Sequence, residues 1–419
     1  MITTPNLSNV LAMDFGTSNT AAGVIIDGRS HLIKIENEDE TLPTSIFYDS
    51  ASKTVRFGRD ANRSLIEGDE GRFMRALKSV LGTSLMHEKR YLLGQNITFV
   101  DVIARFIREV KERSETEMQQ SFDYALSGRP VFFHSNNNEK DKQALDDLTK
   151  CYLKAGFKGV EFFFEPEAAA LASGVLKNNE IALIVDIGGG TSDFCLFRAC
   201  ENRIEVLANN GVRIGGTNFD RSLSIDHVMP LLGHKEQIKM EMGAGTLTAP
   251  KTIFHELATW ERIPSLYTPD NRRFASKLHK LAVNKRPFAR LEKVLELELG
   301  HDIAFASERA KIDTNRIGFA NIELGFVERE LDIPLSSETL NQSLQNHAQD
   351  IANSTLETLK LAQCSPEKID KVIFVGGSSL MNVVDAAVAP LFPSAELHYS
   401  DAFTAIVDGL ALASEKYAR

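Results

Sequence analysis

Two segments of the chain share one order of apolar and polar residues. Each opens with an apolar run, VLAMDF at 10–15 and IALIVDI at 181–187, that predicts a buried β-strand. A loop rich in glycine and hydroxyl residues follows, and a second apolar run, AAGVII at 21–26 and FCLFRA at 194–199, predicts a returning strand. The segments lie about 170 residues apart, and this weak internal duplication predicts two similar lobes.

Helical patterns alternate with the strands. The segments 101–120 and 142–156 repeat apolar residues at helical spacing, and the second ends at a glycine suited to a helix C-terminus. The stretch EPEAAALASG at 165–174 predicts a helix that begins directly after the apolar run VEFFF, with Pro166 in its first turn. Strands that alternate with helices predict an α/β fold.

The second half of the chain contains more helical than strand patterns. Residues 223–312 carry several helical patterns and few strand signals, so we expect a helix-rich insertion there. Near the end, KVIFV at 371–375 predicts a strand, GGSS a turn and LMNVVDAAVAPLF a helix. The last helix is expected at about 401–417.

Length and composition narrow the class of protein. A chain of 419 residues exceeds what one hydrophobic core supports, so two or more domains are expected. The net charge of -10 argues against a nucleic-acid partner, and no apolar run reaches the ~20 residues of a membrane helix. The N-terminus lacks the basic and apolar regions of a signal peptide. We therefore expect a cytoplasmic protein with no nucleic-acid and no membrane partner.

The cysteine and histidine residues suggest no metal site. The spacing of Cys151, Cys195, Cys200 and Cys364 fits neither a zinc site nor a disulfide framework, so buried reduced thiols are expected. The ten histidines form no HExxH or similar cluster.

The loop GGGTSD at 188–193 has the chemistry of a phosphate site. Successive glycine N–H groups can converge on anionic oxygens, and hydroxyls add donors. Carboxylates beside such a loop would repel phosphate unless a cation such as Mg²⁺ lies between them. A further glycine turn, Gly376 and Gly377, is expected to open a helix whose N-terminus favours anions. The alternative for either hairpin loop alone is a tight turn, where glycine and aspartate are common.

The motifs LAMDFGTSNT, VDIGGGTSDF, FEPEAAALASG, IGGTNFD, SERAKI and VIFVGGSSLM resemble the nucleotide-binding motifs of the DnaK-type heat-shock chaperone ATPases. They occur in the family order and span roughly residues 10–415. The resemblance implies the actin-like, ribonuclease-H-like α/β fold, with nucleotide in a cleft between two lobes. Within that family, the chain is most similar to the short DnaK-like proteins called YegD. The implied organisation is lobe I at 1–180, lobe II at 181–400 with the insertion at about 223–312, and a C-terminal helix at 401–419 that returns to lobe I.

The resemblance also implies ATP or ADP and Mg²⁺ as ligands, and it assigns residues to them. The catalytic residues would be Lys78, Glu165, Thr191 and Asp193. The residues that hold hydrated Mg²⁺ would be Asp14 and Asp186. The nucleotide-binding residues would be Gly16, Thr17, Ser18, Gly188, Gly189, Gly190, Thr191, Gly215, Gly216, Thr217, Glu308, Lys311, Gly376, Gly377 and Ser378.

Simpler alternatives exist for these assignments. Lys78 could be a solvated helix lysine, Glu165 a favourable charge at a helix N-terminus, and Asp193 a turn residue. The glycines at 215–216 could form an ordinary turn before a helix. Glu308 and Lys311 could be an exposed helix pair.

The chain departs from the family pattern around the nucleotide base. Ile312 and Leu380 stand where the family usually has basic residues, and Phe403 aligns with an expected acid. The phosphate and metal half of the site thus looks complete, whereas base specificity is in doubt. Only residues 402–419 follow the last motif, so we expect no peptide-binding domain.

The leading functional hypothesis is a slow Mg²⁺-dependent ATPase of chaperone type that signals to an unidentified protein partner. The alternatives are a nucleotide sensor that does not hydrolyse, an actin-like filament protein and, ranked low, a small-molecule kinase on the same fold.

Overall fold

The computed structural model describes residues 9–134, 137–173, 177–200, 203–399 and 404–415. The chain divides into two compact units, one formed by Met1–Gly216 and Ala348–Arg419 and the other by Thr217–His347. Among the described residues, no helix is both long and apolar enough to cross a membrane.

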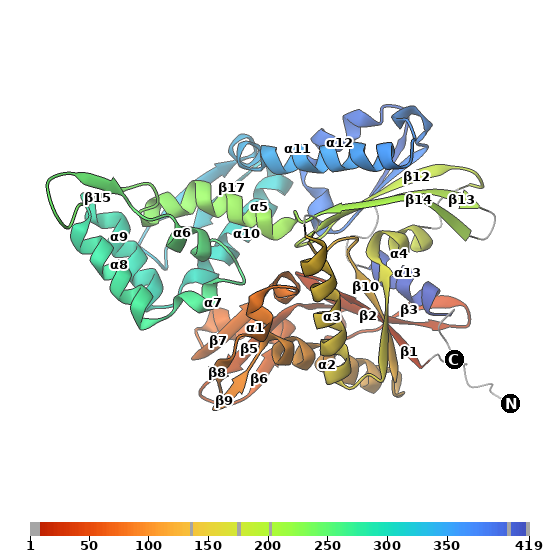
Figure 1. The fold of residues 1–419 in the computed structure, drawn as a ribbon, viewed down its shortest axis with the longest axis horizontal. Helices are drawn as coiled ribbons and strands as arrows, with labels where there is room; N and C mark the ends of the chain where they lie inside the picture. Colours follow the sequence, from red (N-terminus) through yellow and green to blue (C-terminus); the bar gives the residue numbers. More distant parts are fainter. Residues whose placement is uncertain (1–8, 135–136, 174–176, 201–202, 400–403, 416–419) are drawn as a thin grey trace. The chain divides into compact units, whose positions relative to one another are not determined.

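The first unit contains two main sheets with the same strand plan (Figure 1). The first sheet has the order β11-β10-β1-β2-β3, and β4 also pairs with β2. In it, β1 is parallel to β10 and antiparallel to β2. Its strands are β1 (Val10–Phe15), β2 (Asn19–Ile26), β3 (Arg29–Leu32), β4 (Thr41–Pro43), β10 (Tyr124–Arg129) and β11 (Gly159–Phe164).

The second sheet repeats this plan with the order β14-β13-β12-β19-β20. Here β12 is parallel to β19 and antiparallel to β13, as β1 is to β10 and β2. The strands are β12 (Ile181–Ile187), β13 (Ser192–Cys200), β14 (Arg203–Val212), β19 (Lys371–Val375) and β20 (Glu396–Tyr399). The shared topology is what the repeated sequence pattern predicts, and the α/β class is confirmed.

Two short helices, α4 (Glu165–Ala172) and α13 (Ala405–Ser414), pack against each other and against these sheets. α13 contacts β1, β2, β3 and β10, whereas α4 contacts β10 and β11 as well as β12, β13 and β14. The helices cross so closely that a Cβ atom on Gly409 would lie 1.7 Å from the Ala168 carbonyl oxygen. Their small residues therefore bring two backbones into direct contact.

The other face of the first sheet is covered by two longer helices, α2 (Phe99–Met118) and α3 (Asn138–Ala155). Thr98 and Asp101 form a capping box at the start of α2, and Asn137 caps α3, which ends at Gly156 in the left-handed conformation. Smaller elements complete this part of the unit: β5 (Ser45–Asp49), β6 (Val55–Phe57), α1 (Gly58–Glu67), β7 (Gly71–Arg75), the 3-10 helix η1 (Leu77–Val80), β8 (Arg90–Leu92) and β9 (Gln95–Ile97).

The second unit is mainly helical, with two short hairpins. The long helix α11 (Ser337–Leu361) runs from this unit into the first. The elements are α5 (Gly216–Leu223), β15 (Gln237–Lys239), β16 (Thr246–Thr248), α6 (Thr252–Leu257), α7 (Ile263–Leu266), α8 (Pro269–Leu281), α9 (Lys285–Glu296), α10 (Gly300–Ile317), β17 (Phe319–Glu323) and β18 (Asp332–Ser336). This unit, Thr217–His347, includes more residues than the helix-rich insertion expected at 223–312.

Some predicted elements differ in detail from the structure. The glycine turn after β19 leads into a 3-10 helix, η6 (Gly377–Leu380), and α12 (Asn382–Val388) begins only after it. The expected α-helix does not begin at this turn, and the anion site inferred there stays a prediction. α12 also stops before Pro390, which a helix interior does not accommodate. The last predicted helix corresponds to α13, and residues 401–403 lie outside the described part.

The cysteines are free thiols, but they are not all buried. Cys151 and Cys195 are buried, whereas Cys200 and Cys364 are partly exposed. Burial raises the pKa of the Cys195 thiol well above its ordinary value, which keeps it in the neutral form.

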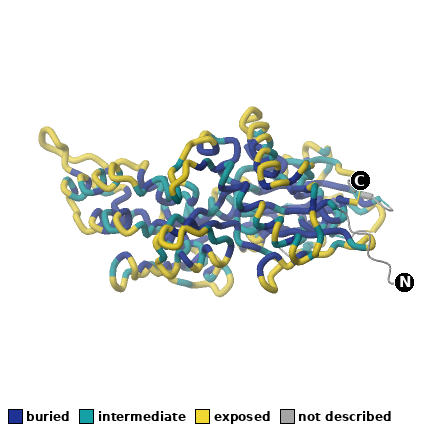
Figure 2. Tube along the Cα trace, turned by 90° about the horizontal axis from the view of Figure 1, so that it is seen from below, coloured by how far each residue is buried: buried dark blue, intermediate teal, exposed yellow. Residues whose placement is uncertain are grey.

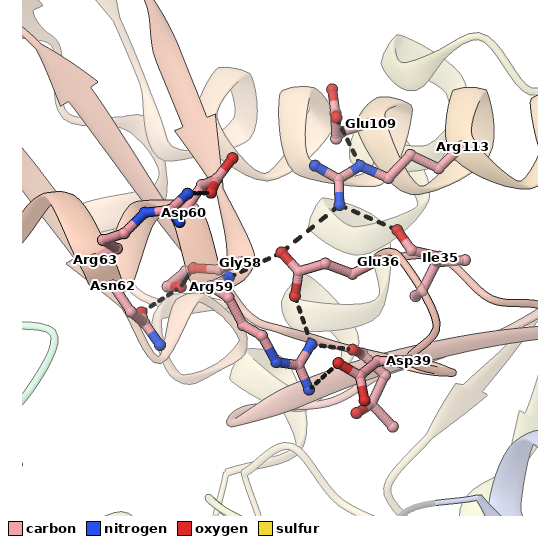
Figure 3. A network of polar contacts seen from close by, with 12 residues as sticks. Ile35, Glu36, Asp39, Gly58, Arg59, Asp60, Asn62, Arg63, Glu109 and Arg113 are labelled. Carbon is pink, nitrogen blue, oxygen red and sulfur yellow. Dashed lines mark hydrogen bonds and ion pairs between the residues drawn. The ribbon is translucent and has the colours of Figure 1, made fainter.

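Glu36 joins α1, α2 and the loop before β4 in a polar network (Figure 3). Phe57 at the N-cap of α1 supplies no side-chain hydrogen bond, and the Glu36 Oε1 atom accepts from the Arg59 backbone N–H at 2.9 Å instead. The buried Glu36 carboxylate also pairs with the Arg59 guanidinium and lies 3.8 Å from that of Arg113. Glu36 thus replaces the missing cap from another part of the chain. Figure 2 shows which stretches of the chain are buried and which are exposed.

We expect Glu36→Ala to lower the free energy of unfolding by about 1–3 kcal/mol, because the first turn of α1 loses its acceptor and two guanidinium groups lose a buried partner. Urea unfolding measures this change. The control is Glu38→Ala, since the Glu38 side chain is 87% exposed and its ion pair should contribute little. Equal effects of the two substitutions would contradict the capping role of Glu36.

Candidate functional site

The turn of the β1–β2 hairpin contacts the turn of the β12–β13 hairpin. A Cβ atom on Gly189 would lie 2.4 Å from the Ser18 Oγ atom, and one on Gly190 would lie 2.8 Å from the Thr17 Oγ1 atom. Gly16 is needed within its own turn, where a Cβ atom would lie 2.2 Å from the Asn19 carbonyl oxygen. The two predicted phosphate loops are therefore brought together at a distance that only glycine permits.

Two further glycine segments reach the same place. A Cβ atom on Gly215 would lie 2.6 Å from backbone atoms of Gly189 and Gly190, and the Gly216 N–H donates to the Gly188 carbonyl at 3.0 Å. Gly376 has a φ of 80° and contacts the end of β12. A Cβ atom on Gly376 would be 2.5 Å from the Ile187 carbonyl oxygen.

Ser378, in the turn after Gly376, also belongs to this cluster of turns. Its Oγ atom lies 2.6 Å from the position that a Cβ atom on Gly216 would take. Gly377 is exposed at the start of η6. All four glycine-containing turns named by the sequence motifs thus converge within the first unit.

Lys78 lies beside these turns on η1. Its side chain is buried, and the Nζ atom donates to the Glu165 Oε1 atom at 2.5 Å. Ala76, two residues earlier, takes the left-handed conformation with φ 57°, where the chain leaves β7 and enters η1. Glu165 is also buried and begins α4, followed by Pro166 in the first turn. Lys78 is therefore not the solvated helix lysine that the sequence left open.

Asp186 and Asp193 face each other across the β12–β13 ladder, so both side chains lie on one face. Both are buried, and an Asp193 oxygen accepts from the Val131 N–H at 2.6 Å. The Asp186 Oδ1 atom is buried without a hydrogen-bond partner among the described residues. Asp193 is therefore a buried group and not a simple turn residue.

The carboxyl groups of this site outnumber its lysine. Burial and the charge of Glu165 raise the pKa of Asp14 to about 7 and that of Asp193 to about 8. The same causes raise the pKa of Asp186 well above its ordinary value. Burial opposes the charge of Lys78, but Glu165 and Asp14 outweigh it and raise the lysine pKa. The site therefore carries an excess of acidic groups that a bound cation would stabilise in ionised form.

The donor set fits Mg²⁺ bound through water. Asp14 and Asp186 lie at the ends of the two central strands, and the unpartnered Asp186 oxygen can accept from a metal-bound water. The described residues contain no group of three or more His, Cys, Asp or Glu side chains placed to hold a metal ion. With these two carboxylates accepting from bound waters, the ion would take its remaining contacts from water and from an anion such as phosphate.

A small pocket opens beside Lys78. Several of its lining residues were not singled out from the sequence, because they belong to no recognisable motif. The pocket is lined by Thr17, Lys78, Ser79, Leu81, Pro130, Phe133, Gly190, Thr191 and Arg213. Ser79 and Arg213 lie next to motif residues, and this proximity is the one signal that could have found them.

The remaining site residues predicted from the sequence belong to the second unit or were expected beside the base of the nucleotide. Within the unit Thr217–His347, Lys311 is buried and pairs with Asp220 at 2.6 Å, so it is not part of an exposed helix pair. Glu308 is half-buried and Thr217 begins the unit. Ile312 and Leu380 are 53% and 48% exposed. Phe403 lies outside the described residues.

Comparison with known proteins gives a matching family and similar chaperones, including the following two. The family model for "Hsp70 protein" matches residues 10–248. "Chaperone protein DnaK" of Metamycoplasma hominis is 25% identical over 392 residues, covering 91% of this chain and 54% of that protein. The "Iron-sulfur cluster biogenesis chaperone, mitochondrial" of Saccharomyces cerevisiae is 26% identical over 435 residues, covering 93% of this chain and 57% of that protein. The chain thus spans about half the length of these curated relatives.

We expect Gly215→Ala to lower the free energy of unfolding by about 1–3 kcal/mol, because the added methyl group would meet the backbone of 189–190. Thermal or urea unfolding measures the loss. Gly325→Ala is the matched control, since no atom lies within 4 Å of that position. A stability of Gly215→Ala equal to that of the control would show that the turns are not in close contact.

Asp14 and Asp193 are expected to reduce the stability of the ligand-free chain as the pH rises from about 4 to about 8. The folded-state pKa values of about 7 for Asp14 and about 8 for Asp193 exceed the ordinary value of 3.8, so the folded chain binds protons in this window that the unfolded chain releases. Urea unfolding across this range should show a smaller pH slope for Asp193→Asn. The exposed control Asp60→Asn should keep the wild-type slope. Equal slopes for all three proteins would exclude Asp193 as a source of the pH dependence.

Proposed function

The chain belongs to the Hsp70 family, since the family model matches more than half of its residues, and on this premise we propose that it is a slow Mg²⁺-dependent ATPase of the DnaK-like chaperone type. Proteins of the Hsp70 family have the actin-like α/β fold, and they bind ATP and ADP. The proposal for this chain is that the phosphates of ATP bind where the glycine-containing turns converge.

The observation that carries the proposal is the buried Lys78 ammonium beside those turns. A fixed cation in a site with little water stabilises the charge on a phosphoryl group during transfer, which is usually the largest catalytic contribution. The glycine turn at 188–190 would let phosphate oxygens approach the backbone, and the hydroxyl groups of Thr17, Ser18 and Thr191 would hold them. In this arrangement Lys78 would exchange part of its contact with Glu165 for a contact with the terminal phosphate.

The carboxylates would act on water. Glu165, which pairs with Lys78, and the buried Asp193 would orient the attacking water by accepting its hydrogen bonds. Asp14 and Asp186 would accept from waters of the metal ion. When bound, Mg²⁺ would neutralise negative charge on the phosphate oxygens.

The partner and the compartment are also part of the proposal. Hsp70-family chaperones bind nucleotide and often protein partners, so a nucleotide-dependent protein partner follows from the family. We propose a cytoplasmic location and the YegD-like subgroup on the same basis, from the sequence resemblance described above.

A second candidate is a nucleotide sensor that binds ATP without hydrolysing it. The exposed Ile312 and Leu380 side chains favour it, because neither can supply the cationic contact expected at the base. A sensor of this kind would be stabilised by nucleotide in thermal unfolding and would show no turnover.

We expect Lys78→Ala to reduce single-turnover hydrolysis of ATP in Mg²⁺ on the order of 10²–10³-fold, because the transition state loses its fixed cation. Labelled ATP with excess protein measures the rate, and thermal unfolding checks that the variant folds. Lys360→Ala is the control, since its side chain is 78% exposed. Unchanged turnover in Lys78→Ala would remove this lysine from the mechanism, and nucleotide binding without turnover in the wild type would favour the sensor.

A further inference from the structure

The Asp193 carboxylate is held by a backbone group from a distant part of the chain. Its Oδ1 atom accepts from the Val131 N–H at 2.6 Å. Gly211 lies opposite Asp193 in the β13–β14 ladder, and a Cβ atom on Gly211 would lie 2.7 Å from the same oxygen. Val131 and Gly211 thus both lie against this oxygen. The N–H can fix the carboxylate only if Val131 is itself fixed.

Val131 belongs to the segment 130–134, which follows β10 directly. Pro130 and Phe133 of this segment line the small pocket beside Lys78. The residues of the segment lie outside the helices and strands, so no helix or ladder of their own fixes the backbone there. Their position must come from contacts with side chains.

Asp141, in the first turn of α3, supplies two of these contacts. Its Oδ1 atom accepts from the Phe133 N–H at 2.6 Å and from the His134 N–H at 3.2 Å. Phe133 and His134 come two and three residues after Val131. A single carboxylate therefore fixes the backbone next to the N–H that Asp193 accepts.

Arg129 anchors the other end of the segment. Its Nε atom donates to the carbonyl oxygen of the next residue at 3.0 Å, and one terminal nitrogen donates to the Val131 carbonyl oxygen at 3.1 Å. The same nitrogen lies 3.4 Å from the Asp141 Oδ2 atom. The guanidinium carbon lies 5.3 Å from the centroid of the Phe133 ring and 5.1 Å from that of the Phe164 ring.

The pair of Arg129 and Asp141 differs from an ordinary surface ion pair. The two side chains are 14% and 18% exposed, so water screens their contacts only weakly. Between them they engage the backbone of the segment 130–134 on both sides of the Val131 N–H. Neither residue belongs to the motifs that identify the nucleotide site.

We propose that Arg129 and Asp141 are positioning residues for Asp193. Together they hold the segment 130–134 so that the Val131 N–H keeps the Asp193 carboxylate where it can accept from the attacking water. The inference rests on the ATPase function proposed above and deepens it, because it extends the site to two residues that act through the backbone.

The first test measures amide hydrogen exchange of wild type and Asp141→Ala without nucleotide. We expect the amides of Phe133 and His134 to exchange faster, since they lose their acceptor. The Val131 amide, whose acceptor lies on β13, should also exchange about 10-fold faster. A purely local role of Asp141 would leave Val131 unchanged. Glu139→Ala is the matched control, because Glu139 is exposed in the same first turn of α3.

The second test measures single-turnover hydrolysis of ATP with Mg²⁺, together with the affinity for ATP. We expect Asp141→Ala and Arg129→Met to lower the hydrolysis rate about 10–100-fold, because a misplaced carboxylate no longer orients the water. The ATP affinity should stay near that of wild type, since Asp193 is proposed to act on the water and not on the nucleotide. Asp141→Asn keeps an oxygen for the two amides and should retain most of the rate, and Glu139→Ala should retain all of it.

The proposal requires both effects in Asp141→Ala. Faster exchange at Val131 with an unchanged rate, or a slower rate with unchanged exchange, overturns it while the ATPase function stands. Equal effects of Glu139→Ala and Asp141→Ala also overturn it, because a lost charge at the start of α3 would then explain both. If Asp141→Ala does not fold, Arg129→Met must show the same two effects in its place.

Failure of the ATPase function gives a different result. If wild type neither binds nor hydrolyses ATP, that function is wrong, and the catalytic purpose of the pair is excluded with it, whatever the amide exchange shows.

Discussion

The structure of the site depends on backbone segments approaching one another more closely than side chains allow. The turn at 188–190 lies against Thr17 and Ser18 on one hairpin and against Gly215, while Gly376 lies under the end of β12. Each contact would be blocked by a Cβ atom, so the positions are restricted to glycine by packing as well as by hydrogen bonding. Thr17 and Thr191 line the pocket beside these turns, and their hydroxyl groups can donate to an anion.

The electrostatic character of the site follows from the same packing. Because the central strands of both sheets end here, their terminal aspartates are brought together with Glu165 in a region from which water is largely excluded. Charge repulsion and burial then raise the pKa values of these carboxyl groups, and Lys78 is held fully charged among them. Without a ligand, this excess of buried carboxyl groups lowers the stability of the folded chain, and a bound cation would reduce that loss.

Much of this arrangement could be predicted from the sequence, because it depends on local patterns. The strands 10–15 and 181–187 have the predicted bounds, and the repeated pattern correctly indicates the shared sheet topology. The burial of Lys78 could not be derived from its neighbours, since its partner Glu165 is 87 residues away. The contact between His134 and Arg213 could not be foreseen for the same reason, since the two residues lie 79 positions apart. The turn at Gly377 was predicted to open an α-helix, but the chain first forms a 3-10 turn there.

The crossing of α4 and α13 has a mechanical consequence for this chemistry. The Ala168 carbonyl and Gly409 meet with no side chain between them, so the two helices cannot move closer, and turning about the crossing is the motion that preserves their contact. α13 rests on the sheet that carries Asp14, and α4 carries Glu165 one helical turn from the crossing. If the angle between the helices changed, the Glu165 carboxylate would be displaced relative to this sheet, and its contact with Lys78 would lengthen or shorten with it.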